Sequence, residues 1–391
     1  MKIGILTSGV LPVPAVQGGA VENLIDFCLE YNEQKRLHDI TVYTVNHPKL
    51  KNHTALTSEV NHYHIIETNS RAAKIRKNIY HLLHQKDEYY HYTVEYYLHE
   101  ALKHINRQNY DLILIENRPG YALKLKNRTK ARIVIHQEND YLNTDTQNYQ
   151  EIYDAVSLII NTSDYITQRV RTIQPNDTKC RTVLNGIDVQ RFLNAHPAQR
   201  QTLPLCDDDF VIVYSGRLTE DKGILPLIKA IKQTPEILHL KLMIVGASSY
   251  GKDKQPTSFI KQLQQESESI KDKVVFTGFI DYEKVPSLLK MADIAVVPSM
   301  WEEPFGLTVV EAMAAGLPLI TTRSGGIPEI CEGVAMIVER ENIVSNLASA
   351  ILDLYQHPEK RKHMSAAAVE RSKLFDKERY AREFFKAIEN P

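Results

Sequence analysis

The sequence predicts an α/β protein built from two doubly wound, Rossmann-like parallel sheets. Short apolar segments alternate with longer helical patterns along most of the 391 residues. Segments that are apolar throughout are typical of parallel strands whose two faces are both covered by helices. A chain of this length also exceeds the size at which one core keeps growing, so two domains are expected.

The predicted strands fall into two sets on either side of a polar connector. That connector, Asp188 to Asp209, holds two prolines and three consecutive aspartates. The first set comprises Lys2–Thr7, Asp39–Val45, His62–Glu67, Leu112–Glu116, Arg132–His136 and Leu158–Asn161. The second set comprises Phe210–Ser215, Leu240–Val245, Val274–Thr277, Ile294–Pro298, Leu317–Thr321 and Ala335–Val338. We therefore expect domains over residues 1–190 and 207–372. After the last strand we expect only helices, at about Asn342–Tyr355, Pro358–Ser372 and Lys377–Ile388.

Composition narrows the class of protein. The formal net charge of −1 gives no support to nucleic-acid binding, and 43% hydrophobic with 24% charged residues is ordinary for a globular protein. The four cysteines are far apart, which favours a reducing compartment over a disulfide framework or a zinc site. Prolines and Gly9 interrupt the apolar start, so it is interpreted as a first strand and not as a signal peptide. With no run of about 18 apolar residues, we expect a cytoplasmic protein.

The most informative motif is a pair of glutamates, Glu303 and Glu311, around the segment Pro-Phe-Gly-Leu-Thr-Val-Val. It lies where the strand Ile294–Pro298 gives way to a helix at about Thr308 to Ala315. A Gly-containing loop of this kind directs backbone N–H groups and the positive end of the helix dipole to one point, which suits phosphate. Carboxylates, in contrast, are good acceptors for sugar hydroxyls. The motif predicts a nucleotide-sugar ligand.

Two further segments follow predicted strands and could hold phosphate. Gly18 and Gly19 come after the first strand and open a helix, where paired glycines permit close backbone approach; a plain strand-to-helix turn is the alternative. Ser215-Gly216-Arg217 ends the first strand of the second domain, with Lys222 shortly after it. These two cations could neutralise a diphosphate; a solvated pair on an acidic loop is the alternative.

His136 closes a predicted strand and precedes the polar run Gln137 to Asp140. In open parallel sheets ligands bind beyond the carboxyl ends of strands, so His136 is a candidate for the site, although a lone histidine is more often structural. For the glycine-containing turns at Asn185–Asp188 and Ser324–Glu329, a purely conformational role of the glycines is given at least as much weight as a role in binding.

Two further patterns are interpreted as ordinary structural features and not as functional sites. Asp207 to Asp209 fits the Asp-x-Asp pattern of metal-dependent sugar transfer, but it precedes a strand, and we interpret it as a solvated turn. The basic amphipathic segment Arg71 to Gln85 could rest on an anionic membrane surface. An ordinary domain helix with a charged outer face is favoured instead.

Together, Arg217, Lys222, the Glu303-to-Glu311 motif and the Gly18-Gly19 loop resemble the retaining glycosyltransferases of family 4. The resemblance extends along nearly the whole chain. It implies the GT-B fold, in which two such domains face a cleft, with the acceptor mainly on the first domain and the donor on the second. It also implies that the last segment, residues 373–391, is a helix that returns to the first domain.

The resemblance also implies a role for each motif residue. Glu311 would bind the ribose hydroxyls, Glu303 the hydroxyls of the transferred sugar, and His136 would lie near that sugar. Arg217 and Lys222 would hold the diphosphate with their side chains. Backbone N–H groups would complete its site, from Gly18, Gly19, Phe305, Gly306 and Leu307, and Ser215 and Gly216 would also contact the nucleotide sugar. Backbone near Gly278 would meet the base, and Asn185 would help to shape the cleft.

The predicted function is metal-independent transfer of a hexosyl unit, with no cofactor beyond the nucleotide-sugar co-substrate, most simply a UDP-sugar. Fixed donors would stabilise the departing diphosphate, so no dedicated nucleophile is nominated. A glycan or lipid-linked acceptor in cell-surface polysaccharide or glycoconjugate synthesis is expected, and a peripheral contact with the inner membrane face stays open. The alternatives are a non-catalytic partner subunit and a GT-B sugar-nucleotide epimerase or hydrolase. A nicotinamide-dependent dehydrogenase is disfavoured because the glycine fingerprint is missing.

Overall fold

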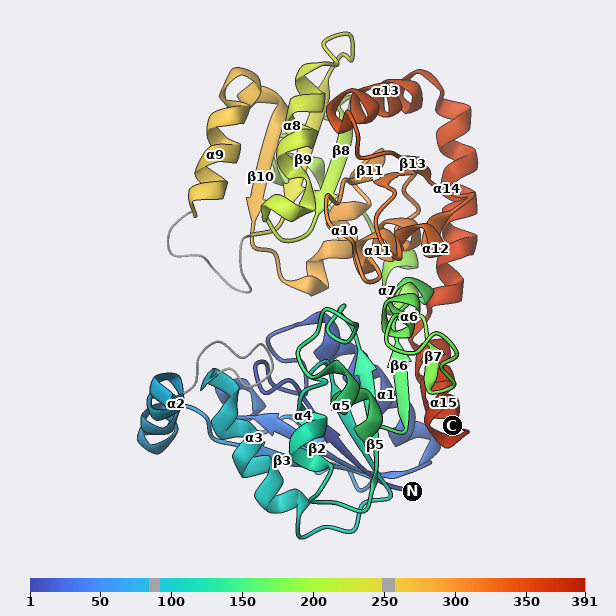
Figure 1. Cartoon of the computed structure of the whole chain (residues 1–391). Coiled ribbons are helices and arrows are strands. Elements are labelled where there is room, and N and C mark those ends of the chain that lie inside the picture. Colours follow the sequence, from blue (N-terminus) through green and yellow to red (C-terminus); the bar gives the residue numbers. More distant parts are fainter. Residues whose placement is uncertain (84–91, 248–256, 391) are drawn as a thin grey trace. The chain divides into compact units, whose positions relative to one another are not determined.

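The structure, a computed structural model, describes residues 1–83, 92–247 and 257–390 of the chain. The chain divides into two compact units. The first consists of Met1–Asn185 together with Glu378–Pro391, and the second of Gly186–Lys377. Each unit has a parallel sheet with its own core (Figure 1).

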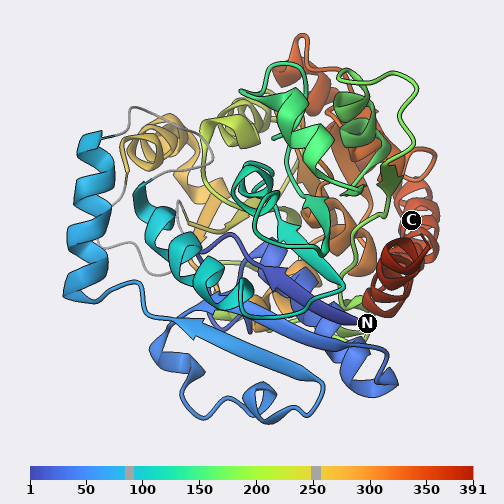
Figure 2. The same cartoon turned by 60° about the horizontal axis from the view of Figure 1, so that its bottom comes forward.

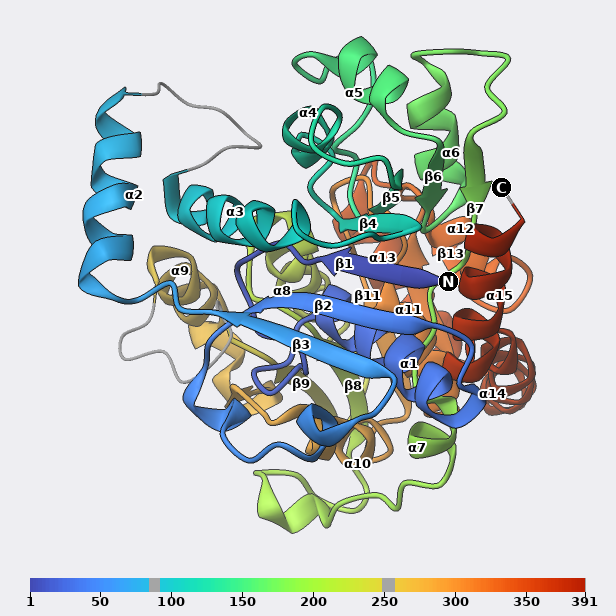
Figure 3. The same ribbon diagram turned by 90° about the horizontal axis from the view of Figure 1, so that it is seen from below.

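The first unit contains a seven-stranded parallel sheet in the order β3-β2-β1-β4-β5-β6-β7. Its edge of three blue strands is visible in Figures 2 and 3. The strands are β1 Lys2–Leu6, β2 Asp39–Val45, β3 Asn61–Ile66, β4 Leu112–Glu116, β5 Arg132–Gln137, β6 Leu158–Asn161 and β7 Cys180–Thr182. The first six lie within one residue of their predicted bounds. The prediction missed β7, because it has only three residues and no apolar run marks it.

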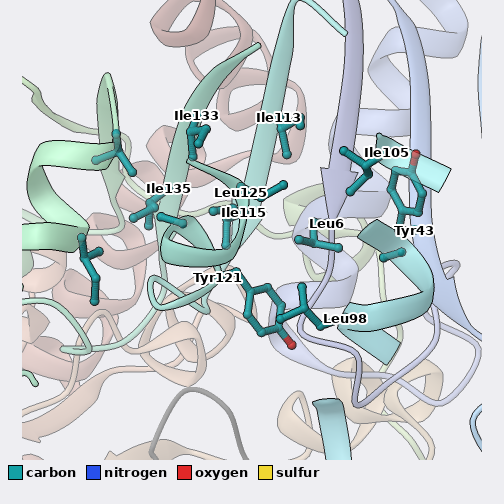
Figure 4. Close-up of a cluster of buried hydrophobic side chains, with 14 of the residues drawn as sticks. Leu6, Tyr43, Leu98, Ile105, Ile113, Ile115, Tyr121, Leu125, Ile133 and Ile135 are labelled. Carbon is teal, nitrogen blue, oxygen red and sulfur yellow. The ribbon is translucent and has the colours of Figure 1, made fainter. Parts of the chain in front are cut away.

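Helices cover both faces of this sheet. The helices of this part of the chain are α1 Ala20–Lys35, α2 Arg71–Leu83, α3 Tyr92–Ile105, α4 Tyr121–Leu125, α5 Tyr149–Ala155 and α6 Asp164–Arg171, with short 3₁₀ turns η1 Pro48–Leu50 and η2 Thr54–Thr57. Of these, α2 packs mainly on α3. On one face, side chains of α3 and α4 pack on the strands. Tyr43, Leu98 and Tyr121 are among the largest fully buried side chains of this cluster (Figure 4).

The opposite face of the same sheet is covered by α1 and by the last helix, α15 (Lys377–Glu389). Tyr380, Phe384 and Phe385 of α15 are each at most 3% exposed and pack with strand residues such as Ile3 and Val134. The end of the chain is therefore part of the hydrophobic core of the first unit.

The second unit contains a six-stranded parallel sheet in the order β10-β9-β8-β11-β12-β13. The strands are β8 Phe210–Ser215, β9 Leu240–Val245, β10 Val274–Gly278, β11 Ile294–Val297, β12 Leu319–Thr322 and β13 Met336–Val338. Their α-helices are α8 Ile224–Lys232, α9 Ser258–Ser267, α10 Val285–Leu289, α11 Leu307–Ala314, α12 Ile327–Cys331, α13 Ile343–Gln356 and α14 Pro358–Ser372. The 3₁₀ turns are η3 Arg200–Thr202, η4 Glu220–Lys222, η5 Glu268–Lys273, η6 Tyr282–Lys284 and η7 Lys373–Phe375. All six strands were predicted to within two residues.

The segment predicted as a connector begins with a short helix, α7 (Val189–Leu193), which packs against α11 inside the second unit. The chain enters and leaves this unit at neighbouring points. Ile187 donates its N–H to Phe375 O at 2.9 Å and accepts the N–H of Lys377 at 2.9 Å, and it pairs with Asp376 as a parallel bridge. The Lys377 ammonium lies 3.0 Å from the Asp188 carboxylate at the same place.

Candidate functional site

The loop between β11 and α11 ends in a set of free backbone donors. Among the residues that the structure describes, the N–H groups of Phe305, Gly306 and Leu307 have no hydrogen-bond partner. The Phe305 side chain is 3% exposed and packs edge-on against Phe375 with ring centroids 5.9 Å apart, which fixes the loop to the core. The first turn of α11 carries no acidic residue. This helix start is suited to an anion, because its unpaired N–H groups add to the positive end of the helix dipole.

Lys222 and Glu303, predicted as separate contacts to phosphate and sugar, form a direct ion pair. The Lys222 ammonium lies 2.6 Å from Glu303 Oε1 and 4.9 Å from the centre of the Trp301 ring. The Ser299 hydroxyl donates to the same carboxylate oxygen at 2.7 Å. Both bonds go to Oε1, and in the described chain Oε2 has no partner. The carboxylate is thus held in one orientation with one oxygen left to accept hydrogen bonds.

The Glu303 backbone is locked by the loop that follows β12. Gly326 N–H donates to Glu303 O at 2.8 Å, and Ser324 and Thr322 hydroxyls donate to Ser299 O at 2.9 and 2.6 Å. A Cβ on Gly325 would lie 2.1 Å from Glu303 O, so only glycine permits this close approach. The turn at 324–329 therefore shapes the backbone on which Glu303 stands.

Ser215-Gly216-Arg217 lies at the carboxyl end of β8, with Gly216 N–H bonded to Val245 O at 3.0 Å. The Tyr214 hydroxyl donates to Arg217 O at 2.7 Å and so fixes the turn. The Arg217 side chain is exposed, and no hydrogen bond or ion pair to it occurs within the described ranges. Its guanidinium is available to an anionic ligand.

Glu311 lies in α11, where it is 7% exposed, and it accepts a hydrogen bond from the Tyr282 hydroxyl at 2.8 Å. Burial raises the pKa of Glu311 to about 7, although the Tyr282 bond acts in the opposite direction. Tyr282 is itself packed by α7, with the Phe192 ring 6.2 Å away and the Arg191 guanidinium 5.4 Å from the ring centre. The carboxylate is therefore a fixed, weakly acidic acceptor.

Gly278, predicted near the base, ends β10 and accepts the N–H of Gly246 at 3.2 Å. It is exposed, and a Cβ there would meet nothing within 4 Å. The chain around Gly278 consequently has room for a ligand, and η6 with Tyr282 follows it directly.

In the first unit, Gly18 and Gly19 precede α1 as predicted, but the start of this helix already holds a carboxylate. Glu22, in the first turn of α1, is 5% exposed, and a Cβ on Gly19 would lie 2.1 Å from its Oε2. Burial raises the pKa of Glu22 to about 7, and the nearby carboxylates of Glu116, Asp26 and Glu138 act in the same direction. Phosphate binding by this loop stays a prediction.

His136 ends up enclosed between two glutamates. Its ring is 1% exposed, donates from Nδ1 to Glu116 Oε2 at 2.8 Å, and places Nε2 at 2.9 Å from Glu138 Oε1, an ion-pair distance without hydrogen-bond geometry. Burial alone lowers the pKa of His136, but the two carboxylates outweigh it and raise the pKa to about 10. Asn185 donates to the other Glu138 oxygen at 2.5 Å, and Phe384 packs edge-on to the imidazole. The expected contact between this ring and a sugar is therefore not supported: the imidazolium is buried and already paired.

Asp207 to Asp209 is only partly a solvated turn. Asp209 is 5% exposed and accepts the N–H of Cys206 at 2.6 Å, while Arg200 donates to the carbonyl oxygens of Asp207 and Asp209. Ligand atoms of Cys206, Asp208 and Asp209 lie within 4.8 Å of one another, the one such cluster found in the described ranges. It precedes β8, whereas Arg217 follows that strand, so the six residues of β8, roughly 20 Å of extended chain, separate the two.

Several residues of the second-unit arrangement were not predicted. Ser299 could have been found, because it comes two residues after β11 at the carboxyl end of the sheet. Tyr282, Phe192 and Arg191 carry no sequence signal, since they reach Glu311 only through the packing of η6 and α7 around α11. Among the described residues, no helix combines the length and apolar character required to cross a bilayer.

Most of the second unit matches a family of known glycosyltransferases. Residues 196–371 match the family model described as "Glycosyl transferases group 1". Spore coat protein SA of Bacillus subtilis (strain 168) is 28% identical over 384 residues, covering 93% of this chain and 92% of that protein. The lipopolysaccharide 1,2-N-acetylglucosaminetransferase of Salmonella typhimurium is 26% identical over 262 residues, covering 65% and 67%.

Among solved structures, HepE of Anabaena in complex with UDP aligns with a TM-score of 0.73 at 20% identity, covering 100% of both chains. This likeness, with two parallel-sheet Rossmann-like domains in the chain, confirms the predicted GT-B fold class. The chain carries a group 1 glycosyltransferase domain and is a glycosyltransferase.

Proposed function

We propose that this glycosyltransferase moves a hexosyl unit from a UDP-sugar to a glycan or lipid-linked acceptor, with retention of the anomeric configuration and without a metal ion. One observation carries the proposal. In the second unit, the free N–H groups at the start of α11 occur in the same loop as the oriented Glu303 carboxylate, which pairs with Lys222. Donors for a diphosphate and an acceptor for hydroxyls are thus supplied by one loop.

The cations and the helix start would stabilise the leaving group. As the bond to the sugar breaks, negative charge develops on the diphosphate, and prearranged donors lower the barrier because they need no reorganisation. Arg217 has no competing partner in the described chain. Lys222 keeps one N–H on Glu303 and has two more to give. Neither group requires a cofactor to do this.

The two glutamates would bind hydroxyls at the two ends of the donor. Glu303 Oε2 accepts from the transferred sugar, since Oε1 is taken by Lys222 and Ser299. Glu311 accepts from the ribose. One oxygen of Glu311 already accepts a hydrogen bond from the Tyr282 hydroxyl. Tyr282 lies in η6, shortly after Gly278, whose exposed backbone would face the base. The departing phosphate oxygen takes the acceptor's proton on the same face, so no protein nucleophile is assigned.

His136 is assigned a positioning role in place of a substrate contact. It ties the ends of β4 and β5 together through Glu116 and Glu138, and through Glu138 it reaches Asn185, the last residue before the second unit. Acceptor binding is proposed for the first unit, including the Gly18-Gly19 loop.

The choice of donor and setting draws on relatives. HepE, which shares the fold, was crystallised with UDP, and this supports a uridine nucleotide. The Salmonella relative is named for lipopolysaccharide, and this supports a cell-surface polysaccharide or glycoconjugate as the product. A cytoplasmic location is part of the proposal, and the four free cysteines support a reducing compartment.

The test is transfer by point variants of the second unit. Lys222→Ala and Glu311→Ala should each lower transfer from UDP-hexose roughly 100-fold or more, because each removes a contact made to the donor. Lys229→Ala and Glu236→Ala, which alter exposed residues of the same unit, are matched controls and should keep full activity. Full transfer by both site variants would contradict the assignment.

A second experiment identifies the nucleotide. Thermal unfolding is compared with UDP, GDP, ADP and dTDP, since a ligand that binds only the folded state raises its midpoint. UDP should give the largest shift, and Arg217→Ala should remove it. A shift with UDP but no turnover with any UDP-sugar, together with a stable complex with another transferase, would favour a non-catalytic partner subunit.

A further inference from the structure

Helix α2 (Arg71–Leu83) exposes a row of large apolar side chains. Ile75 is 61% exposed, Ile79 51% and Leu82 82%. The other exposed large hydrophobic residues in the described chain are scattered singly over different elements, as is normal. Figure 3 shows α2 at the rim of the first unit, next to α3. A row on a single short helix is therefore a distinct feature of this surface.

The row points away from the body of the first unit. At 100° per residue, positions 75, 79 and 82 fall within an arc of about 60°. Ala73, which is fully buried, lies on the opposite side, and Lys77 on that side donates to Thr68 O at 3.1 Å. The helix thus packs on the unit with one face and presents apolar side chains on the other. The outer face is thus more apolar than expected: it carries this row of side chains together with the exposed cations Arg71 and Lys74.

The border of the row is cationic. The α2 sequence RAAKIRKNIYHLL contains four Arg and Lys residues and no acidic residue. Arg71 and Lys74 are exposed on one flank of the row. Apolar side chains bordered by cations suit a surface with an apolar interior and anionic headgroups, where each cation contributes about 1 kcal/mol.

A second copy of the chain fits this surface less well. Two such helices face to face would bring eight cations together with no acidic residue of α2 to pair them. Three side chains also bury far less than the roughly 1,200 Å² of a stable interface. Neither objection applies to an anionic bilayer.

We propose that α2 lies on the surface of an anionic membrane, with Ile75, Ile79 and Leu82 in the boundary between headgroups and acyl chains and with Arg71 and Lys74 against lipid phosphates. The proposal rests on the proposed function in one respect, that a lipid-linked acceptor lies in the same membrane plane. Binding to the bilayer itself does not depend on transfer.

Vesicle flotation of the full chain, without donor or acceptor, tests this. The protein should float with phosphatidylglycerol-containing vesicles at low salt, float poorly with pure phosphatidylcholine, and be released as salt screens the cations. The variant Ile75→Ser/Ile79→Ser/Leu82→Ser should bind at least ten-fold more weakly. Leu238→Ser, which changes a 69% exposed leucine of the second unit, should bind like the wild type.

UDP-induced thermal stabilisation of the same variants keeps the two proposals apart. The triple variant should retain it, because no residue of the donor site is altered. Equal vesicle binding by wild type and triple variant, or no binding by the wild type at low salt, overturns the membrane proposal. So does concentration-dependent dimerisation that the triple variant abolishes, since a second copy would then cover the row.

Discussion

The helices α1 and α11 are built alike but begin differently. Each follows a glycine after a strand, and each carries one buried glutamate whose pKa burial raises to about 7. In α1 that glutamate is Glu22, in the first turn against Gly19. In α11 it is Glu311, the fifth residue of the helix where Glu22 is the third, and the first turn holds no acid.

The difference shows that a glycine before a helix does not by itself leave the helix start free for an anion. The helix start attracts negative charge, and whatever carboxylate stands in the first turn competes for it. In α1, Glu22 occupies that position whenever it is ionised. In α11 that position is free, and the buried glutamate lies beyond the first turn, where it accepts a hydrogen bond from Tyr282. This comparison favours the second unit as the main holder of the diphosphate.

Of the substitutions that test this comparison, Gly325→Ala should have the largest effect, because it disrupts the loop before α11. Its Cβ would lie 2.1 Å from Glu303 O and 2.8 Å from Glu303 N, so the loop must move. We expect the free energy of unfolding to fall by about 3 kcal/mol, with loss of UDP stabilisation. Gly18→Ala, where nothing lies within 4 Å, should cost only about 1 kcal/mol for its backbone conformation. Urea unfolding measures both, and equal losses would contradict this view of the loop.

Glu311→Gln should change how stability depends on pH. In the folded chain Glu311 holds its proton up to a pKa of about 7, against an ordinary value of 4.5. The wild type therefore loses stability as pH rises from about 4.5 through 7, by about 2–3 kcal/mol. The variant lacks this loss, so its unfolding free energy relative to wild type should rise across that window while donor binding disappears. Parallel pH profiles would show that Glu311 is ionised throughout.

Thr308→Glu would give α11 the acidic first turn that α1 has. The added carboxylate should oppose the diphosphate and raise the KM for donor roughly 5- to 30-fold, which corresponds to about 1–2 kcal/mol. Thr308→Gln, of the same size but neutral, is the control and should change KM little. Steady-state kinetics at low salt provide the measurement; an unchanged KM for Thr308→Glu would mean that the diphosphate lies elsewhere.

Glu22→Gln is the reverse experiment and should have the smallest effect. If the Gly18-Gly19 loop contacts the diphosphate, removing the charge of Glu22 should lower the KM for donor two- to five-fold (about 0.4–1 kcal/mol) at pH 8. At pH 6, where the pKa of about 7 leaves wild-type Glu22 mostly protonated, wild type and variant should agree. Identical KM values at both pH values would remove this loop from the donor site.

The sequence was sufficient for the sheets, because buried parallel strands are short apolar runs bounded by turn residues. It also found the loop of Glu303, where a strand ends and a helix begins. It could not predict that Lys222 pairs with Glu303, since 81 residues separate them and only the sheet brings the loops after β8 and β11 together.

The burial of His136 was also beyond the sequence. Its place at a strand end was correct, but one of its partners, Glu116, comes from the neighbouring strand β4, and Phe384 comes from the last helix. The outward row of α2 was likewise hidden, because a helical pattern gives the angle between side chains but not the face that meets the protein.

The second unit is an insertion in the first, and a single bridge between Ile187 and Asp376 joins the two ends of the inserted segment. A spacer of a few residues between Asn185 and Glu378 would restore one continuous polypeptide for the first unit, because the two ends of the inserted segment are hydrogen-bonded to each other. The inserted piece, with adjacent ends, has the topology that tolerates excision, circular permutation and transplantation. Under the proposed function, in which the second unit holds the donor, such an exchange would change donor preference and leave the surface of the first unit intact.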